Sequence, residues 1–353
     1  MPARYNNARG RGAAANPPNR FEPLSYEPDS ELDERADVSP TTQFFKDSSK
    51  SFITYNRSPD VDFEASINPY RGCEHGCIYC YARPTHEYFG FSAGLDFEAK
   101  ILVKEDGPEL LARELSHPNW QPQVVGVSGV TDPYQPVERR LQLTRRCLEV
   151  FVRFKNPVAI ITKNYLVTRD IDLLARLAEI NAVTVYISIT TMDAHLGRVM
   201  EPRTSVPERR LEAINRLSRK GIETGVLVAP VIPGMTEHEI PEILKAASEA
   251  GAKCAGYIML RLPHGVAPLF EGWLERNYPD RKDKVLNRIR SIRGGKLNDP
   301  QYGSRMRGDG IFADQIENLF SLACKRVGLE TQGPELNVSG FFGPADSQLG
   351  LFN

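Results

Sequence analysis

The sequence predicts an α/β fold in which six parallel strands and their crossover helices form a partial barrel. Short runs rich in Val and Ile show little polar alternation, as strands covered on both faces do. Longer amphipathic stretches lie between these runs. Right-handed crossovers between such units give an open parallel (βα)6 barrel. Barrels of this kind place their chemistry at the C-terminal ends of the strands.

The predicted elements follow one another in the βα rhythm. The six strand candidates are Ser66–Tyr70, Val124–Ser128, Val158–Thr162, Val183–Ile189, Gly225–Val231 and Ala255–Leu260. The helices between them are Val137–Phe154, Arg169–Ile180, Pro207–Lys220 and Thr236–Ala250. Thr236 and Glu239 have the spacing of a capping box. Gly221 and Gly251 follow the third and fourth helices, where a C′ glycine is expected.

The segments that flank the barrel differ from it in composition. Residues 1–50 are rich in Pro, Asn, Arg, Asp and Ser without sustained periodicity, which predicts a flexible N-terminal arm. The barrel core is expected over residues 51–265, and residues 266–330 are expected to be a helical, basic extension. Helices are predicted there over Leu269–Tyr278, Lys284–Ile292 and Ile311–Val327. Residues 331–353, punctuated by Gly and Pro, predict a flexible tail.

Composition and charge indicate a globular protein of the cytoplasm. Charged residues make up 25% of the chain, and the formal net charge is −1, so any attraction to nucleic acid must be local. No apolar run approaches the roughly 20 residues of a membrane span, and the start of the chain lacks the apolar region of a secretory signal. Three of the six cysteines fall within eight residues, which favours a metal site in a reducing compartment over disulfides.

The cysteine motif carries the strongest chemical signal. Cys73, Cys77 and Cys80 have the spacing C-x3-C-x2-C, within NPYRGCEHGCIYCYAR just after the first predicted strand. Iron–sulfur clusters ordinarily take four thiolates. Three thiolates leave one iron of a cubane without a protein ligand, which is useful only if another molecule chelates it. The alternative is a structural zinc site with His75 or His86 as the fourth ligand, although no second cysteine-rich knuckle is present.

The motif C-x3-C-x-(aromatic)-C, with Tyr79 as the aromatic residue, resembles the signature of radical S-adenosylmethionine (SAM) enzymes. The resemblance implies a [4Fe–4S] cluster on Cys73, Cys77 and Cys80, with the methionine amino and carboxylate groups of SAM on the fourth iron. It further implies reductive cleavage of the sulfonium bond and hydrogen abstraction by a 5′-deoxyadenosyl radical. A reductant such as flavodoxin or ferredoxin is implied as a partner.

Within this superfamily the chain resembles the spore photoproduct lyase-like branch, often labelled DNA-repair-photolyase-like. The segments RGCEHGCIYCYARPTHEY and VTDPYQPVE are similar to a subfamily of stand-alone proteins. The resemblance implies that Lys163 reaches the cofactor, that Ser188 contacts its ribose or carboxylate, and that Arg210 holds the methionine carboxylate. Ser128 and Asp132 correspond to positions that contact the amino group or the ribose.

The chain departs from the photoproduct lyases at one important position. Those enzymes carry a hydrogen-donor cysteine at the end of the second strand, where this chain has Ser128-Gly129-Val130-Thr131-Asp132. Cys147 lies inside the next helix and is expected in the core. The thymine-dimer reaction itself is therefore not expected. Tyr134 and Tyr257 are candidate relays for a hydrogen atom, although packing is the commoner role of such tyrosines.

Two segments suggest macromolecular partners. Residues 281–307 carry nine basic side chains, which predict either contact with a nucleic acid or a solvated surface. They are Arg281, Lys282, Lys284, Arg288, Arg290, Arg293, Lys296, Arg305 and Arg307. At the C-terminus, Gln348, Leu349, Leu351 and Phe352 resemble the peptide with which bacterial repair proteins dock on the sliding clamp; alternatively, this apolar tip folds back onto the barrel.

These observations favour a radical SAM enzyme that acts on a damaged or modified nucleic acid. The same class of enzyme acting on RNA, a peptide or a small metabolite is the main alternative. A non-catalytic iron–sulfur protein for electron transfer or sensing is a third, and it would not require Lys163, Ser188 or Arg210.

Overall fold

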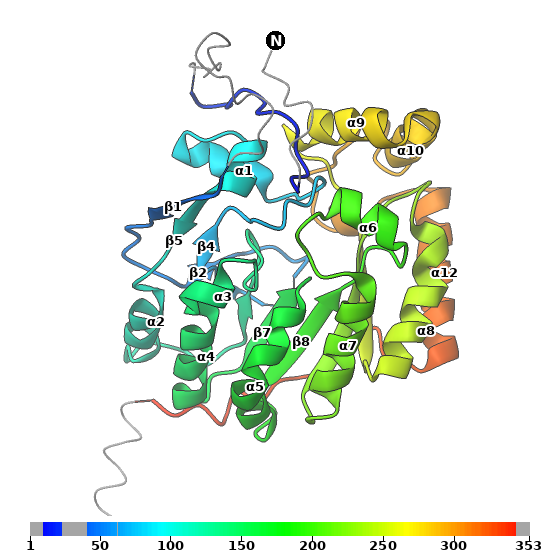
Figure 1. Cartoon of the computed structure of the whole chain (residues 1–353). Helices are drawn as coiled ribbons and strands as arrows, with labels where there is room; N and C mark the ends of the chain where they lie inside the picture. Colours follow the sequence, from blue (N-terminus) through cyan, green and yellow to red (C-terminus); the bar gives the residue numbers. More distant parts are fainter. Residues whose placement is uncertain (1–9, 23–40, 62, 344–353) are drawn as a thin grey trace, which may run out of the picture.

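The computed structural model describes residues 10–22, 41–61 and 63–343, and a seven-stranded sheet lies at its centre (Figure 1). The sheet order is β10-β9-β8-β7-β6-β3-β2, in which β2 pairs antiparallel with β3 and all other pairs are parallel. The strands are β2 (Thr54–Tyr55), β3 (Ala65–Ile67), β6 (Val125–Val127), β7 (Val158–Thr162), β8 (Val183–Ser188), β9 (Glu223–Val231) and β10 (Cys254–Met259). Each predicted strand overlaps one of the six parallel strands, so the predicted partial barrel is confirmed.

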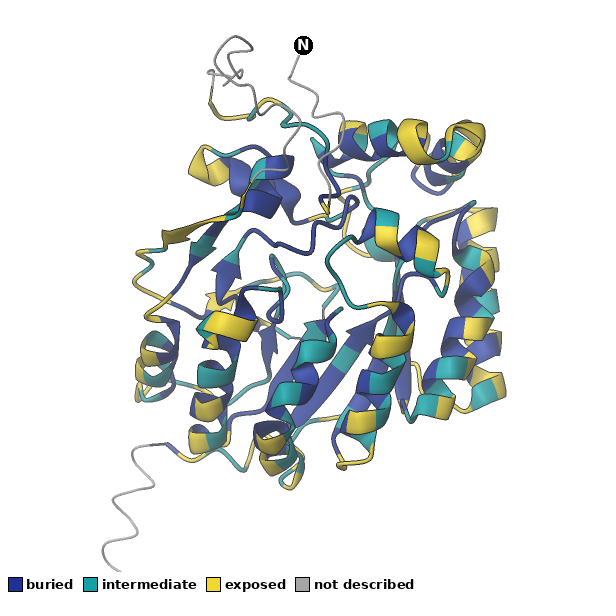
Figure 2. Cartoon of the chain, in the orientation of Figure 1, coloured by how far each residue is buried: buried dark blue, intermediate teal, exposed yellow. Residues whose placement is uncertain are grey.

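The outer face of the sheet is covered by helices whose buried sides face inward (Figure 2). These are α4 (Leu143–Phe154), α5 (Ile171–Ala178), α7 (Pro207–Ser218) and α8 (Ile240–Ala250), with α12 (Ile311–Val327) beside α8. The core between the layers consists largely of Val, Ile and Leu, as at Val127, Ile160 and Val185, which are at most 1% exposed. Burying each such side chain contributes about 1.5–3 kcal/mol.

Two helix starts differ from the sequence prediction. The long helix over Val137–Phe154 is interrupted by Gln142 in the left-handed conformation (φ 52°), which separates α3 (Glu138–Leu141) from α4. The capping box at Thr236 is wrong. The Glu239 carboxylate accepts instead from Thr191 Oγ1 at 2.8 Å and from the Met192 N–H at 2.6 Å, because it satisfies the loop that follows β8.

The remaining helical elements complete the outer layer, surround the mouth of the barrel or form the C-terminal extension. They are η1 (Arg83–Phe89), α1 (Leu95–Ala99), α2 (Gly107–Leu115), η2 (Tyr165–Asp170), α6 (Ala194–Met200), η3 (Glu237–Glu239), α9 (Val266–Asn277), α10 (Pro279–Ser291) and α11 (Ser304–Arg307). Figure 1 shows α9 and α10 at the same end of the molecule as α1 and α6, which is the end where the parallel strands terminate. The described helices include none that is both long and apolar enough to cross a membrane.

Part of the predicted N-terminal arm is packed against the barrel. Strand β1 (Gln43–Lys46) pairs in parallel with β5 (Lys100–Val103), which also pairs with β4 (Tyr70–Arg71) in a second, small sheet. Ala13 is 1% exposed. Backbone hydrogen bonds contribute much of the attachment of these segments, and such bonds need no particular side chains. The sequence therefore shows no hydrophobic periodicity there.

The described part of the predicted tail is also attached. The Asn337 N–H donates to Asn181 O, and the Phe342 N–H donates to Phe154 O, both at 2.8 Å. This segment therefore runs along the end of the barrel opposite its mouth (Figure 1). The clamp-like residues Gln348, Leu349, Leu351 and Phe352 lie outside the described residues.

Candidate active site

The three motif cysteines lie on one loop that follows β4 at the mouth of the barrel. The Cys73 N–H donates to Phe97 O at 2.9 Å, and the Cys80 N–H donates to Cys77 O at 3.2 Å. Gly76 turns the loop with a φ of 69°. Cys73 and Cys77 are 7% and 8% exposed, and Cys80 is partly exposed.

The three thiols influence one another electrostatically. Burial raises the pKa of all three thiols, and neighbouring thiols add to the rise at Cys73 and Cys77. Backbone N–H groups lower these pKa values: that of Asp132 lowers the pKa of Cys73, and that of Ala82 lowers the pKa of Cys80. The three thiols share one loop, and metal binding would displace the protons that burial favours.

The zinc alternative finds no support in the ligand geometry. In the part of the chain that the structure describes, no three His, Cys, Asp or Glu side chains converge on a single-ion site. His75 has both ring nitrogens engaged, with Nδ1 3.4 Å from Asp132 Oδ2 and Nε2 2.9 Å from Asn164 Nδ2. His86 Nε2 lies 2.8 Å from Lys100 O. Both histidines considered as a fourth zinc ligand thus contact protein groups through at least one ring nitrogen.

Lys163 and Tyr79 meet at the carboxylate of Glu201, the residue that follows α6. Lys163 Nζ lies 3.1 Å from Glu201 Oε1 and donates to Thr190 Oγ1 at 2.9 Å and Ala229 O at 2.8 Å. The Tyr79 hydroxyl donates to the same carboxylate oxygen. Burial raises the pKa of Glu201, but Arg210 and Lys163 outweigh it and hold this pKa well below its usual range. The ionised Glu201 carboxylate thus links Tyr79 of the cysteine loop to Lys163, which follows β7 and in turn contacts the ends of β8 and β9.

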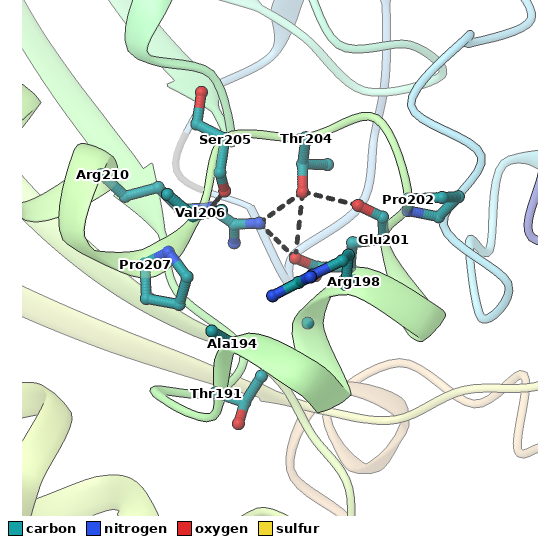
Figure 3. Close-up of a pocket in the computed structure, with 11 residues that line it drawn as sticks. Thr191, Ala194, Arg198, Glu201, Pro202, Thr204, Ser205, Val206, Pro207 and Arg210 are labelled. Atoms are coloured by element: carbon teal, nitrogen blue, oxygen red, sulfur yellow. Dashed lines mark hydrogen bonds and ion pairs between the residues drawn. The ribbon is translucent and has the colours of Figure 1, made fainter. Parts of the chain in front are cut away.

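Arg210, on α7, is almost entirely engaged by protein groups. Its guanidinium forms an ion pair with Glu201 and donates to Thr204 Oγ1 at 2.6 Å, to Ser205 O at 2.7 Å and to Ser188 O at 2.9 Å. A pocket lined by Glu201, Thr204 and Arg210 opens beside this network, between α6 and α7 (Figure 3). Arg210 therefore ties the end of β8 to the loop before α7, and its predicted contact with a methionine carboxylate stays a prediction.

Asp132 forms a second junction, between the ends of β6 and β7. Its carboxylate accepts from Thr162 Oγ1 at 2.7 Å and from the N–H groups of Tyr134 and Lys163, each at 2.8 Å. Burial raises the pKa of Asp132, but His75 and these hydrogen bonds lower it to below its usual range. Ser128 donates to Thr131 O at 3.2 Å in the same loop. The cofactor contacts predicted for Asp132, Ser128 and Ser188 stay predictions.

The candidate hydrogen relays Tyr134 and Tyr257, and the helical Cys147, are all buried. Cys147 is 1% exposed within the core, as predicted. Tyr134 is fully buried, with the Arg169 guanidinium 6.0 Å from its ring. Tyr257 packs on Phe320 of α12 with ring centroids 4.7 Å apart, so it faces the outer helical layer. The structure assigns a packing role to all three side chains.

Sequence reasoning missed two members of the site, Glu201 and Thr190. Neither stands in a recognisable motif, and each gains its role only where separate elements meet. The single sequence signal was the position of Thr190 just beyond a predicted strand, where barrel chemistry is concentrated.

Taken together, the fold and the site define a parallel α/β barrel with a three-cysteine loop at its mouth. The chain belongs to the radical SAM superfamily, whose family model matches residues 67–247. An uncharacterized protein of Mycobacterium tuberculosis is 34% identical over 250 residues, covering 70% of this chain and 72% of that protein. An uncharacterized protein of Methanocaldococcus jannaschii is 28% identical over 222 residues, 63% of this chain and 79% of that protein.

The fold is similar to that of spore photoproduct lyase, in agreement with the resemblance seen in the sequence. The structure of that lyase complexed with dinucleoside spore photoproduct matches with a TM-score of 0.57 and 17% identity, over 82% of this chain and 80% of that chain. Membership of the superfamily implies an enzyme of radical chemistry, which is expected to bind an iron–sulfur cluster and SAM and to need a reductant.

Proposed function

We propose that this protein is a radical SAM enzyme in which Cys73, Cys77 and Cys80 hold a [4Fe–4S] cluster. The observation that carries the proposal is the buried group of three thiols on one loop at the barrel mouth. When bound, the cluster and SAM supply one-electron cleavage of a sulfonium bond, which generates a radical that abstracts hydrogen from a substrate.

The chain's own residues have three tasks in this proposal. Near-complete burial of Cys73 and Cys77 keeps water from the thiolates. The backbone N–H groups of Asp132 and Ala82 lower the pKa of the Cys73 and Cys80 thiols and so oppose the larger effect of burial. The Lys163–Glu201–Tyr79 network anchors the cysteine loop to the strand ends, so that the loop keeps one conformation.

The test of this proposal is cofactor cleavage by the native chain. We expect the anaerobically reconstituted, reduced protein to release 5′-deoxyadenosine from SAM. A protein that binds the cluster but leaves SAM intact would instead be an electron carrier or a sensor, and the proposal would fail.

A nucleic acid is the substrate class that we propose. Its support is a rim of cations and aromatic rings beside the cysteine loop, made of Tyr81, Arg261, Tyr302 and Arg305. The Arg261 guanidinium lies 4.8 Å from the Tyr81 ring, and that of Arg305 lies 4.4 Å from the Tyr302 ring. Tyr81 directly follows Cys80 in the chain. Nucleic acids offer both phosphates for the cations and bases that stack on the rings.

Arg261 is the member of the rim best suited to an anionic ligand. It lies two residues beyond β10, where the strand ends at the mouth, and it is partly buried. Burial and the nearby Arg305 lower the pKa of Arg261, and they outweigh Tyr81 and Asp60, which raise it. Among the described residues no side-chain hydrogen bond or ion pair satisfies it. The nearby Asp60 carboxylate is paired with Arg305 rather than with Arg261. A partly desolvated cation that forms no ion pair of its own is costly, and a phosphate would reduce that cost.

The basic segment 281–307 contributes less to this surface than its composition suggested. Arg293 is 3% exposed and donates to Leu260 O at 2.9 Å and to Ser304 O at 3.0 Å, so it holds the end of β10 in place. Arg305 pairs with the Asp60 carboxylate. The proposed contact therefore depends on Arg261 and the two tyrosine rings of the rim, since the charge of Arg305 is already paired.

Tyr302→Ala and Arg261→Gln are each expected to weaken binding of a single-stranded oligonucleotide about tenfold, since one stacked base is worth about 1–3 kcal/mol. Fluorescence anisotropy at two salt concentrations measures this, and the Arg261 variant should also show a smaller salt dependence. Arg326→Gln, an equal charge change at an exposed site on α12, should bind as the native chain does. Equal binding by all variants would exclude the rim, whatever the outcome of the SAM assay.

A further inference from the structure

The N-terminal segment of residues 10–22, here called the strap, lies across the cysteine loop. Figure 1 shows it in dark blue at the mouth end, close to α1 and α9. Two consecutive N–H groups of the strap, those of Gly12 and Ala13, donate to the Glu98 carboxylate at 3.0 and 2.8 Å. Arg11 Nη1 donates to the Glu98 carbonyl at 2.6 Å. The strap is thus fixed by its backbone to one buried acidic residue.

The same acidic residue is linked to the cysteine loop through Arg83. Arg83 is fully buried, and its Nη2 donates to Glu98 Oε1 at 2.5 Å. The guanidinium also donates to the Cys77 carbonyl at 2.9 and 3.0 Å and to the Gly76 carbonyl at 3.3 Å. Glu98 and Arg83 therefore link the strap to the backbone carbonyl groups of Gly76 and Cys77 in the cysteine loop. Removing either partner would leave a buried charge unpaired.

The strap and the loop cross with their backbones in contact. A Cβ atom on Gly12 would lie 1.8 Å from Gly76 O. A second crossing follows, where a Cβ on Gly94 would lie 2.0 Å from Ala15 O. The φ of Gly12 does not lie in the left-handed region, so its backbone conformation does not require glycine. Glycine is required there because a side chain would have no space. No side chain can be added at Gly12 without separating the strap from the cysteine loop.

Contacts on both sides of these crossings extend the attachment. Arg203 Nε donates to Gly10 O at 3.0 Å at one end. At the other end, the Asp96 N–H donates to Asn16 Oδ1 at 3.0 Å, and Ser92 Oγ donates to Pro17 O at 2.6 Å. Within the strap, Ala13 belongs to the same buried apolar cluster as Cys77 and Tyr79. The strap thus spans the loop from the α6 side to the α1 side.

We propose that the strap is a positioning and shielding element of the cysteine site. By closing over the loop at Gly76 and Cys77, it fixes the loop that carries the thiols and keeps water and dissolved oxidants from that side. The purpose proposed for the strap depends on the proposed cluster, whereas the contacts that hold the strap do not. Gly12, Glu98 and Arg83 are accordingly positioning residues, which act on the thiols through the loop backbone.

The test compares Gly12→Ala with Gly272→Ala, in which the new Cβ meets only the flexible end of Arg276 at 3.4 Å within α9. In the cluster-free protein, the rate of Cys77 alkylation by iodoacetamide is followed by mass spectrometry. We expect Gly12→Ala to raise this rate at least about tenfold, because the loop opens without global unfolding. Gly272→Ala should alkylate at the native rate. After reconstitution, Gly12→Ala should also lose its cluster absorbance faster in air.

A second variant keeps the test decisive if Gly12→Ala does not fold. Asn16→Ala removes the Asp96 contact without adding bulk and should raise Cys77 alkylation in the same direction. Native alkylation rates in a folded Gly12→Ala protein, or in Asn16→Ala when the first variant is unfolded, would overturn the strap proposal. Failure of the native chain to bind a cluster would instead overturn the proposed function, because the alkylation assay uses no metal.

Discussion

Cys77→Ala is expected to reduce SAM cleavage to background and to prevent stable cluster assembly. Three thiolates are the fewest protein ligands that hold a cubane while leaving one iron for SAM, so the loss of one leaves two irons without a protein ligand. Cys77 is also closely surrounded, because Arg83 donates to its carbonyl and the Glu201 carboxylate acts on its thiol. The native chain should bind about four irons after reconstitution, and the variant should bind far fewer.

The matched control for this experiment is Cys324→Ala. Cys324 is 1% exposed within α12 and packs in the core away from the cysteine loop. The control variant should retain iron, cluster absorbance and 5′-deoxyadenosine formation, with only a modest loss of stability from the smaller side chain. If Cys77→Ala formed 5′-deoxyadenosine at the native rate, the three-thiol assignment would have to be abandoned.

The barrel could be predicted because its determinants are local. Val158–Thr162 and Ile311–Val327 were predicted with the boundaries that the structure shows, since an apolar run or a helical period is a property of neighbouring residues. Gly251 ends α8 in the left-handed conformation as its position indicated. The cysteine motif was equally visible because its three ligands lie within one short loop.

The rest depended on contacts between distant residues. Residues 10–22 gave no periodic signal because backbone N–H groups and a glycine crossing hold them, and the partner Glu98 lies more than 80 positions away. Glu201 has no motif of its own. Its role arises where Tyr79, Lys163 and Arg210 converge from three other elements. Such junctions are set by tertiary structure, and a single sequence does not display them.

Two buried ion-paired carboxylates, Glu98 and Glu201, explain how one loop can be held at the end of an open barrel. The cysteine loop packs Ile78 and Tyr79 in a buried apolar cluster, and two buried carboxylates fix it as well. Here Glu98 and Arg83 fix it from the strap side, whereas Glu201 fixes it from the strand side through Tyr79 and Lys163. Both junctions are buried ion pairs, which cost desolvation but define one geometry when every partner is present. The loop is thus held by buried charges in addition to apolar packing.

Glu201→Gln is therefore expected to destabilise the fold by about 3–5 kcal/mol, the usual effect of removing one member of a buried ion pair. The substitution keeps the size of the side chain but leaves Arg210, which is 2% exposed, and Lys163 without their counter-charge. Urea denaturation followed by circular dichroism measures the change in the free energy of unfolding. Restoration towards native stability by a second change, Lys163→Met, would show that the uncompensated charge is the cause, since that change removes one of the two cations.

Glu249→Gln is the control, because Glu249 lies 3.9 Å from Lys245 on α8 with both side chains largely exposed. Exposed pairs of this kind contribute little, so its midpoint should not move measurably. A Glu201→Gln protein as stable as the control would mean that Arg210 and Lys163 find other partners or remain hydrated. The strand-side junction would then not hold the cysteine loop, and the strap would be left as its principal support.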